Sequence, residues 1–91
     1  MTLEEIQQRM AAIPGWTLAD DSKSISRQWK LADFAEALQF ANKIGELAEE
    51  VQHHPDLLVS WGKLVATLTT HDAGGLSEKD FELAGKINTI Q

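Results

Sequence analysis

The chain has 91 residues, with 14 acidic against 8 basic side chains, a net charge of −6 and no cysteine. A chain of this length forms one domain, so a two-domain enzyme is excluded and we expect a single domain over residues 1–91. The dispersed acidic charge argues against direct nucleic-acid binding, and the lack of cysteine excludes disulfides, thiolate zinc sites and cysteine nucleophiles. The acidic, amphipathic N-terminus and the absence of a long apolar run predict a soluble, cytoplasmic protein with no membrane partner.

The first half of the chain predicts a helix, a hairpin and a longer helix. Thr2 and Glu5 form a capping box, after which apolar residues recur at helical spacing as far as Pro14. Two short segments at 16–19 and 25–31 flank a polar stretch and predict a β-hairpin. Asp33 can cap a second helix that extends to about the histidine pair at 53–54.

The second helix carries more apolar residues than one stripe needs. Its expected stripe comprises Phe34, Ala37, Leu38, Ala41, Ile44, Ala48 and Val51. Phe40 and Leu47 form a row beside that stripe. We interpret this row either as a broad core face or as a helix-to-helix contact between subunits.

A second hairpin follows Pro55, with apolar residues alternating on both sides of a glycine. The alternating positions are Leu57, Val59 and Trp61, then Leu64, Ala66 and Leu68. A two-residue loop at Gly62-Lys63 predicts a type II′ turn that pairs Trp61 with Leu64. Trp61 then lies in the core, with stacking against a flat ligand as the alternative. Because Ser77 and Asp80 begin a third helix, the predicted order is αββαββα.

The three histidines are the side chains most suited to exchange protons near neutral pH. Extending the predicted register beyond Asp56 places His54 opposite His71, although a proline interrupts the ladder. Glu49 stands one helical turn before His53, where it can orient the imidazole or form an ordinary surface pair. We therefore expect the three histidines to converge on one acid–base site.

Other kinds of site are not supported by the sequence. His53 and His54 are adjacent and point in different directions, and no HExxH spacing is present, so we expect no metal site. Gly74-Gly75 lacks the lysine and threonine of a P-loop and the glycine pattern of a dinucleotide fold. We interpret these glycines as a loop.

These residues resemble the signature of the pterin-4a-carbinolamine dehydratases. The signature is carried by Glu49-x3-His53-His54-Pro55, by Trp61, by His71 and by Asp80. The resemblance extends over nearly the whole chain, through Gly15-Trp16, residues 25–27, residues 33–37, the 72–76 loop and Asp80-Phe81. It implies an α+β fold, in which a four-stranded antiparallel sheet carries three helices packed on one face. It also implies a homodimer or homotetramer with no metal or bound cofactor.

The resemblance also implies an activity, the loss of water from a 4a-hydroxytetrahydropterin to give a quinonoid dihydropterin. This hydro-lyase step completes the cofactor cycle of the aromatic amino-acid hydroxylases. Two alternatives stay open. The fold could act as a protein-interaction module that stabilises the dimer of a transcription factor, as some animal members do, or it could serve molybdopterin metabolism.

The dehydration needs an acid for the departing hydroxyl and a base for a proton of the ring. We expect Glu49 and the C-terminal end of the second helix to favour the charged form of His53, which makes His53 the general acid and His71 its partner. His54 is assigned mainly to substrate binding. The resemblance adds Pro55, Thr70, Asp72 and Trp61 to the substrate-binding residues. Asp80 is assigned either to support of the site or to capping of the third helix.

Overall fold

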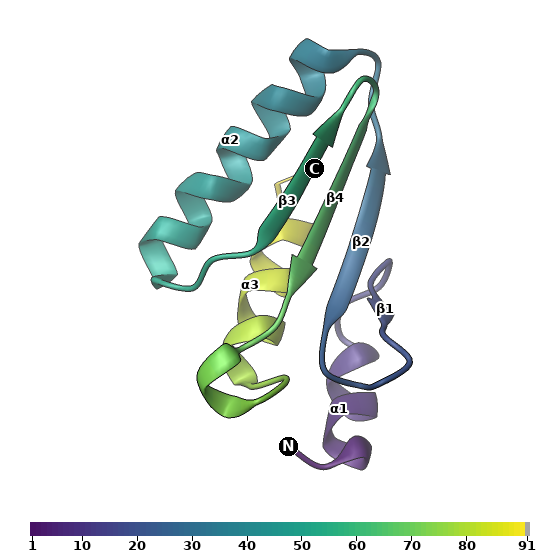
Figure 1. Ribbon diagram of the computed structural model, residues 1–91, viewed down its shortest axis with the longest axis vertical. Coiled ribbons are helices and arrows are strands. Elements are labelled where there is room, and N and C mark those ends of the chain that lie inside the picture. The colour runs from purple at the N-terminus through teal and green to yellow at the C-terminus, as the bar shows by residue number, and fades with distance from the viewer. Residues whose placement is uncertain (91) are drawn as a thin grey trace.

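The computed structural model describes residues 1–90, and Figure 1 shows an antiparallel sheet with helices against one of its faces. The elements in chain order are α1 (Leu3–Met10), β1 (Thr17–Leu18), β2 (Ile25–Lys30), α2 (Phe34–Val51), β3 (Asp56–Ser60), β4 (Lys63–Leu68), the 3-10 turn η1 (His71–Ala73) and α3 (Glu78–Asn88). The strand order across the sheet is β1-β2-β4-β3. The predicted α+β class, the four-stranded antiparallel sheet and the αββαββα order are confirmed.

The helices begin where the capping residues predicted. In α1 the backbone N–H of Glu5 donates to Thr2 Oγ1 at 3.1 Å, and the Glu5 carboxylate accepts from the Thr2 N–H at 2.9 Å. In α2 the Asp33 side chain accepts from the backbone N–H of Glu36 at 2.9 Å. Within residues 1–90, no helix is both long enough and apolar enough to cross a membrane.

An exposed ion pair joins the two ends of the chain. Arg9 Nη2 on α1 lies 2.6 Å from Glu78 Oε1 on α3. The hydrogen bonds from Arg9 hold the pKa of the Glu78 carboxyl below its ordinary value of 4.5. This contact fastens α1 to the first turn of α3.

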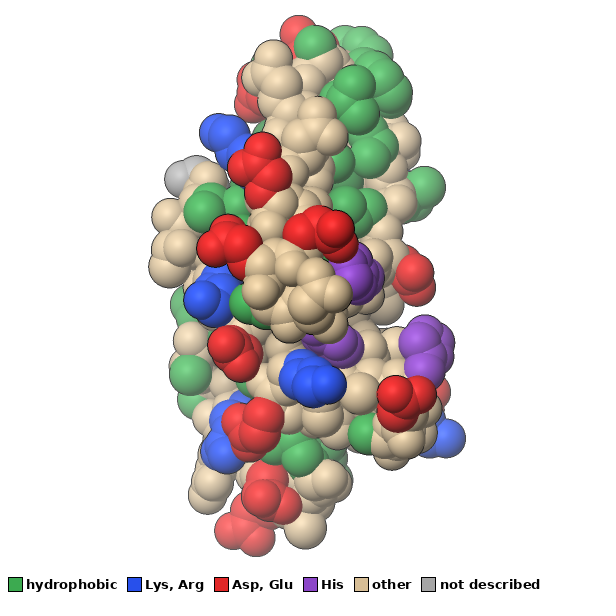
Figure 2. Space-filling model, turned by 90° about the vertical axis from the view of Figure 1, so that its left-hand side faces the viewer, with side chains coloured by type: hydrophobic (Ala, Val, Ile, Leu, Met, Phe, Trp, Pro, Cys, Tyr) green, Lys and Arg blue, Asp and Glu red, His purple; other side chains and the backbone are tan. Residues whose placement is uncertain are grey.

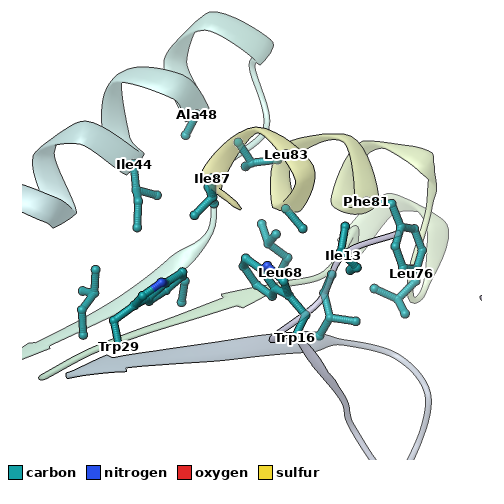
Figure 3. Close-up of a cluster of buried hydrophobic side chains, with 14 of the residues drawn as sticks. Ile13, Trp16, Trp29, Ile44, Ala48, Leu68, Leu76, Phe81, Leu83 and Ile87 are labelled. Atoms are coloured by element: carbon teal, nitrogen blue, oxygen red, sulfur yellow. The ribbon is translucent and has the colours of Figure 1, made fainter. Parts of the chain in front are cut away.

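The core lies between the inner face of the sheet and helices α2 and α3, as the close-up in Figure 3 shows. Trp29 of β2 is at its centre, in edge-to-face contact with Trp16 at 5.9 Å and with Phe40 at 5.0 Å between ring centroids. Its fully buried large side chains are Ile25, Ile44, Leu64, Leu68, Leu83 and Ile87.

The buried face of α2 is rotated relative to the predicted stripe. Phe40 is only 7% exposed and packs on Trp29, whereas Phe34 and Leu38 are 47% and 46% exposed. Leu47 packs against the core as a partly buried residue. Phe40 and Leu47 therefore belong to the core face, and their assignment to a possible subunit contact is wrong. The Trp29 ring favours this orientation, because it offers the Phe40 ring an aromatic partner on the inner face of the sheet.

The register of the second hairpin differs by two residues from the prediction. The loop is Trp61-Gly62, so Ser60 pairs with Lys63 and Val59 with Leu64. The inward face keeps its apolar residues because the shift is even. Gly62 takes a positive φ of 69°, and a Cβ there would lie 3.1 Å from the Leu31 backbone oxygen. This contact with the end of β2 favours glycine at the second loop position rather than the first.

This shift moves Trp61 from its predicted position in the core into the loop. Its side chain is 74% exposed in the loop, so the prediction that it lies in the core is wrong. The pairing of His54 with His71 is also wrong, because the observed register, continued beyond Asp56, sets His54 against Thr69.

Candidate histidine site

All three histidines line one cleft, at the point where the end of α2, the end of β4 and the start of α3 meet. The cleft has a volume of about 300 Å³, and its lining residues are Gln52, His53, His54, Thr69, Thr70, His71, Asp72 and Lys79. Figure 2 shows the histidines gathered on one face of the molecule, with acidic side chains around them. The expected convergence of the histidines is confirmed, although the strand register that predicted it is not.

The end of α2 determines how His53 and His54 enter the cleft. Gln52 is a C-cap in the left-handed conformation, with a φ of 53°, and the backbone N–H of His53 donates to the Ala48 carbonyl at 3.1 Å. This arrangement is a Schellman-type helix end. It turns the chain out of the helix before His53, so the one-turn spacing from Glu49 to His53 no longer holds.

The carboxylate of Glu49 instead contacts His54. The hydrogen bond joins Glu49 Oε2 to His54 Nε2, and both side chains are exposed. The predicted pairing of Glu49 with His53 is therefore wrong. An exposed pair of this kind contributes little to stability, but it can fix the direction of the imidazole.

His53 contacts a carboxylate on α3. His53 Nε2 lies 2.6 Å from Asp80 Oδ1, and the two side chains are 12% and 0% exposed. The second oxygen of Asp80 accepts from the Thr70 hydroxyl at 2.8 Å and from the Ser77 backbone N–H at 2.9 Å. Asp80 therefore both caps α3 and holds the His53 ring, so one side chain has the contacts for both roles offered by the sequence.

These hydrogen bonds determine which atom of His53 is available for chemistry. A buried carboxylate only accepts hydrogen bonds, so Nε2 of His53 carries a proton toward Asp80. Nδ1 of the same ring makes no hydrogen bond to any residue in 1–90. An imidazole held by a carboxylate at one nitrogen and open at the other is the arrangement used for general acid–base chemistry.

His71 approaches the cleft from the loop after β4. It begins η1, and its side chain is exposed and makes no hydrogen bond within the described chain. The loop is closed by a bridge between Thr70 and Gly75, and Gly74 supports the turn with a φ of 69°. Asp72, also predicted in the site, lies beside His71 in the same turn and lines the cleft.

Four of the predicted residues are not among those that line the cleft: Glu49 and Asp80, which contact His54 and His53, and also Trp61 and Pro55. Trp61 lies at the far end of the β3–β4 hairpin from the histidines, and Pro55 leads from His54 into β3. Three lining residues were not predicted, namely Gln52, Thr69 and Lys79. Gln52 and Thr69 adjoin predicted residues in the sequence. Lys79 adjoins Asp80, and it is the only lysine or arginine among the eight residues that line the cleft.

A smaller hollow of about 190 Å³ lies between α2 and β2, with Trp29, Phe40 and Ile90 in its wall, and none of its lining residues is a histidine. In residues 1–90 no group of three His, Asp or Glu side chains is arranged to hold a metal ion. A further hollow along α2 is lined by three glutamates but by no histidine, so the histidine cleft is where the imidazoles are concentrated.

Comparison with known proteins gives a consistent result. The family model described as pterin 4 alpha carbinolamine dehydratase matches residues 1–90. A protein from Picosynechococcus sp., named "Putative pterin-4-alpha-carbinolamine dehydratase", is 44% identical over 90 residues, which is 99% of this chain and 96% of that protein. A protein of the same name from Trichormus variabilis is 48% identical over 86 residues, covering 94% of this chain and 90% of the relative.

Two solved structures share the fold. A crystal structure of a transcriptional coactivator/pterin dehydratase from Brucella melitensis superposes with a TM-score of 0.91 at 32% identity, covering 99% of this chain and 96% of that one. A pterin dehydratase-like protein, identified as a RuBisCO assembly factor in the alpha-carboxysome, superposes with a TM-score of 0.69 at 15% identity. That match covers 86% of this chain and 90% of the other, and it bears on the fold alone.

Proposed function

The chain belongs to the pterin 4 alpha carbinolamine dehydratase family, and from this premise we propose that its histidine cleft removes water from a 4a-hydroxytetrahydropterin. The product is a quinonoid dihydropterin, and the step belongs to pterin recycling for aromatic amino-acid hydroxylases. The observation that carries the proposal is the His53–Asp80 pair at 2.6 Å, open toward a cleft that His54 and His71 also line.

His53 is the proposed general acid, with Asp80 in the orienting role that the sequence suggested for Glu49. In the protonated ring, Nε2–H donates to Asp80 and Nδ1–H is left for the C4a hydroxyl of the substrate. As the C–O bond breaks, the hydroxyl leaves as water with the proton from Nδ1. His71 is the proposed base that takes a proton from a ring nitrogen of the pterin, so the reaction is balanced without a redox partner.

His54 is proposed to bind the substrate rather than to exchange its proton. Its Nε2 is engaged by the exposed Glu49 carboxylate, which fixes the ring at the rim of the cleft. Asp72 and Lys79 add one anionic and one cationic group to the wall. A flat heterocycle with several ring N–H groups and acceptor nitrogens can hydrogen-bond to such a mixed polar wall.

The proposal is tested by generating the carbinolamine enzymatically and following its decay by ultraviolet absorbance. Purified protein at micromolar concentration should accelerate the decay well beyond the spontaneous rate, because paired acid and base groups each contribute about 10²–10⁴-fold. A strong chelator should leave the acceleration unchanged. If the protein does not accelerate the decay, the dehydratase proposal is wrong. If a chelator abolishes the activity and zinc restores it, the mechanism without a metal is wrong.

We also propose that the chain self-associates through one apolar surface, defined by Phe34, Leu38, Leu58 and Trp61. These four side chains are 46–74% exposed. Figure 2 shows hydrophobic side chains gathered at the end of this face away from the histidines. In the described chain β3 pairs only with β4, so its other edge is free and carries no lysine or proline to discourage pairing. A second copy of this surface would cover both features, in agreement with the expected dimer or tetramer.

A role in protein interaction, of the kind that the name transcriptional coactivator/pterin dehydratase gives for the Brucella melitensis protein, is the second candidate. It is favoured only by the exposed apolar surface. The buried Asp80 carboxylate beside His53 favours the enzyme, because an interaction module has no need of a buried charge directed at a histidine.

A further inference from the structure

Thr70 is connected to two of the three histidines, His53 and His71. It is the residue before His71, and its side chain contacts the carboxylate that holds His53. By resemblance it is expected to bind substrate. Its observed hydrogen bonds indicate a different use.

The hydroxyl of Thr70 is already committed within the protein. It donates to Asp80 Oδ2 at 2.8 Å and lies 2.7 Å from Ser77 Oγ. A hydroxyl has one hydrogen, so the Ser77 hydroxyl must be the donor in the second contact. The direction of the network is therefore from Ser77 to Thr70 and from Thr70 to Asp80, with His53 donating to the other oxygen of that carboxylate.

This network is built on a buried carboxylate, which gives its bonds more influence than surface bonds have. The Asp80 side chain is fully buried, and in residues 1–90 no buried side-chain nitrogen or oxygen lacks a partner. A buried carboxylate that loses one donor must turn toward the remaining ones or accept water. Because Asp80 contacts Thr70 through Oδ2 and His53 through Oδ1, a rotation at one oxygen displaces the other.

The backbone of Thr70 supports the second histidine. Its N–H donates to the Gly75 carbonyl at 2.9 Å, and its carbonyl accepts from Ala73 at 3.1 Å and from Gly75 at 3.3 Å. These bonds close the five-residue loop that begins with His71. A shift of Thr70 therefore moves the start of η1 and, with it, His71.

We propose that Thr70 is a positioning residue that sets the placement of His53 and His71 relative to each other, through Asp80 with its hydroxyl and through the 71–75 loop with its backbone. The expected effect on kcat rests on the proposed function, whereas the expected effect on the placement of the two histidines does not. The hydrogen of the Thr70 hydroxyl is donated to Asp80 and is not available to the substrate. Removal of this hydroxyl should therefore lower kcat rather than raise KM.

The test compares three variants of the full chain. Thr70→Val removes the hydroxyl at nearly constant shape, and Thr70→Ser retains it. Thr89→Val is the matched control, because the Thr89 hydroxyl also makes a local bond on α3, to the Lys86 carbonyl at 2.7 Å, but it lies at the far end of the helix. We expect Thr70→Val to lower kcat by about 10- to 100-fold with KM changed less than about threefold, since small misplacements of catalytic groups have effects of this size. Thr70→Ser and Thr89→Val should stay within about threefold of the wild type.

A double variant shows whether the effect passes through His53. In the His53→Ala background, Thr70→Val should cause a much smaller further loss than in the wild type, because effects of residues acting on one group are not additive. An equal loss in both backgrounds, or a wild-type kcat in Thr70→Val, would overturn the proposal.

Ring nitrogen chemical shifts of His53 give a readout that does not depend on activity. In the wild type at high pH they should report the tautomer protonated at Nε2, and Thr70→Val should shift the population or broaden the signal while Thr89→Val does not. If the wild type lacks dehydratase activity but this shift is seen, the proposed function fails and the positioning role stands. If the wild type is active and the His53 spectrum is the same in Thr70→Val, the positioning role fails alone.

Discussion

Replacement of Asp80 by asparagine is the sharpest test of how the site is held together. The carboxylate accepts three hydrogen bonds, from His53 Nε2, the Thr70 hydroxyl and the Ser77 backbone N–H. Asparagine keeps the shape but offers one oxygen and one NH₂ group. If the oxygen stays with Thr70 and Ser77, the NH₂ group faces His53 Nε2, and the neutral ring must carry its proton on Nδ1 instead.

The expected cost in stability follows from these three bonds. A hydrogen bond to a charged group contributes about 1 kcal/mol more than a neutral one, so the three together lose about 3 kcal/mol. Part of this loss is offset because the amide is cheaper to bury than the charge, which leaves a net cost of about 2 kcal/mol. For a domain of this size that is a decrease in Tm of about 8–16 °C.

The expected effect on catalysis is larger than the effect on stability. A neutral ring with its only proton on Nδ1 could donate that proton only by becoming an anion, and the amide opposes the doubly protonated ring that serves as the acid, so kcat should fall by about 10²-fold or more. The assay is carbinolamine decay at a temperature where circular dichroism shows the variant folded. Asp33→Asn is the control, because it removes one charge at the N-cap of α2, where asparagine caps as well as aspartate. A folded Asp80→Asn protein with kcat within twofold of the wild type would refute the proposed role of Asp80.

Three further predictions follow from the other contacts. Glu49→Gln should raise KM severalfold with little change in kcat, because Glu49 fixes His54 rather than the general acid. Steady-state kinetics that show a lower kcat with an unchanged KM would contradict this. Leu58→Glu should lower the molar mass measured by sedimentation at tens of micromolar, while Leu3→Glu, at a residue equally exposed but outside the apolar surface, should not; a monomeric wild type would argue against the surface. Glu78→Gln should lower the Tm near pH 7, and the difference should shrink as the pH falls through and below 4.5, because a carboxyl with a lowered pKa stabilises the fold only while it is ionised; a difference constant with pH would contradict it.

The parts of the fold that the sequence predicted are those specified by neighbouring residues. The capping box at Thr2 and the N-cap at Asp33 begin their helices where expected, because the cap and its partner are three residues apart. The alternation in β3 and β4 selects the inward face correctly. Local chemistry is sufficient in each of these cases.

The parts that the sequence did not predict depend on distant contacts. The loop of the second hairpin is chosen by the approach of Gly62 to the Leu31 carbonyl, which alternation alone does not reveal. The end of α2 at Gln52 uses a left-handed residue that is not glycine, so no usual C-cap signal marks it.

The same limit applies to the site. The pairing of His53 with Asp80 joins residues 27 positions apart. The sequence placed both residues in one signature but did not indicate that they contact each other. The spacing of Glu49 and His53 indicated a helical pair, but the helix ends before that pair can form. The sequence therefore predicted the histidines, Thr70 and Asp72 of the cleft, whereas the partners of the histidines required the structure.

The central claim is that the cleft held by the His53–Asp80 pair performs the dehydration. The most direct measurement is the rate of carbinolamine decay with equal concentrations of wild-type protein and of the His53→Ala/His71→Ala double variant, each shown to be folded. The account predicts strong acceleration by the wild type and a rate close to the spontaneous one with the double variant. Equal acceleration by both proteins would contradict it, because the catalysis would then arise outside this pair of histidines.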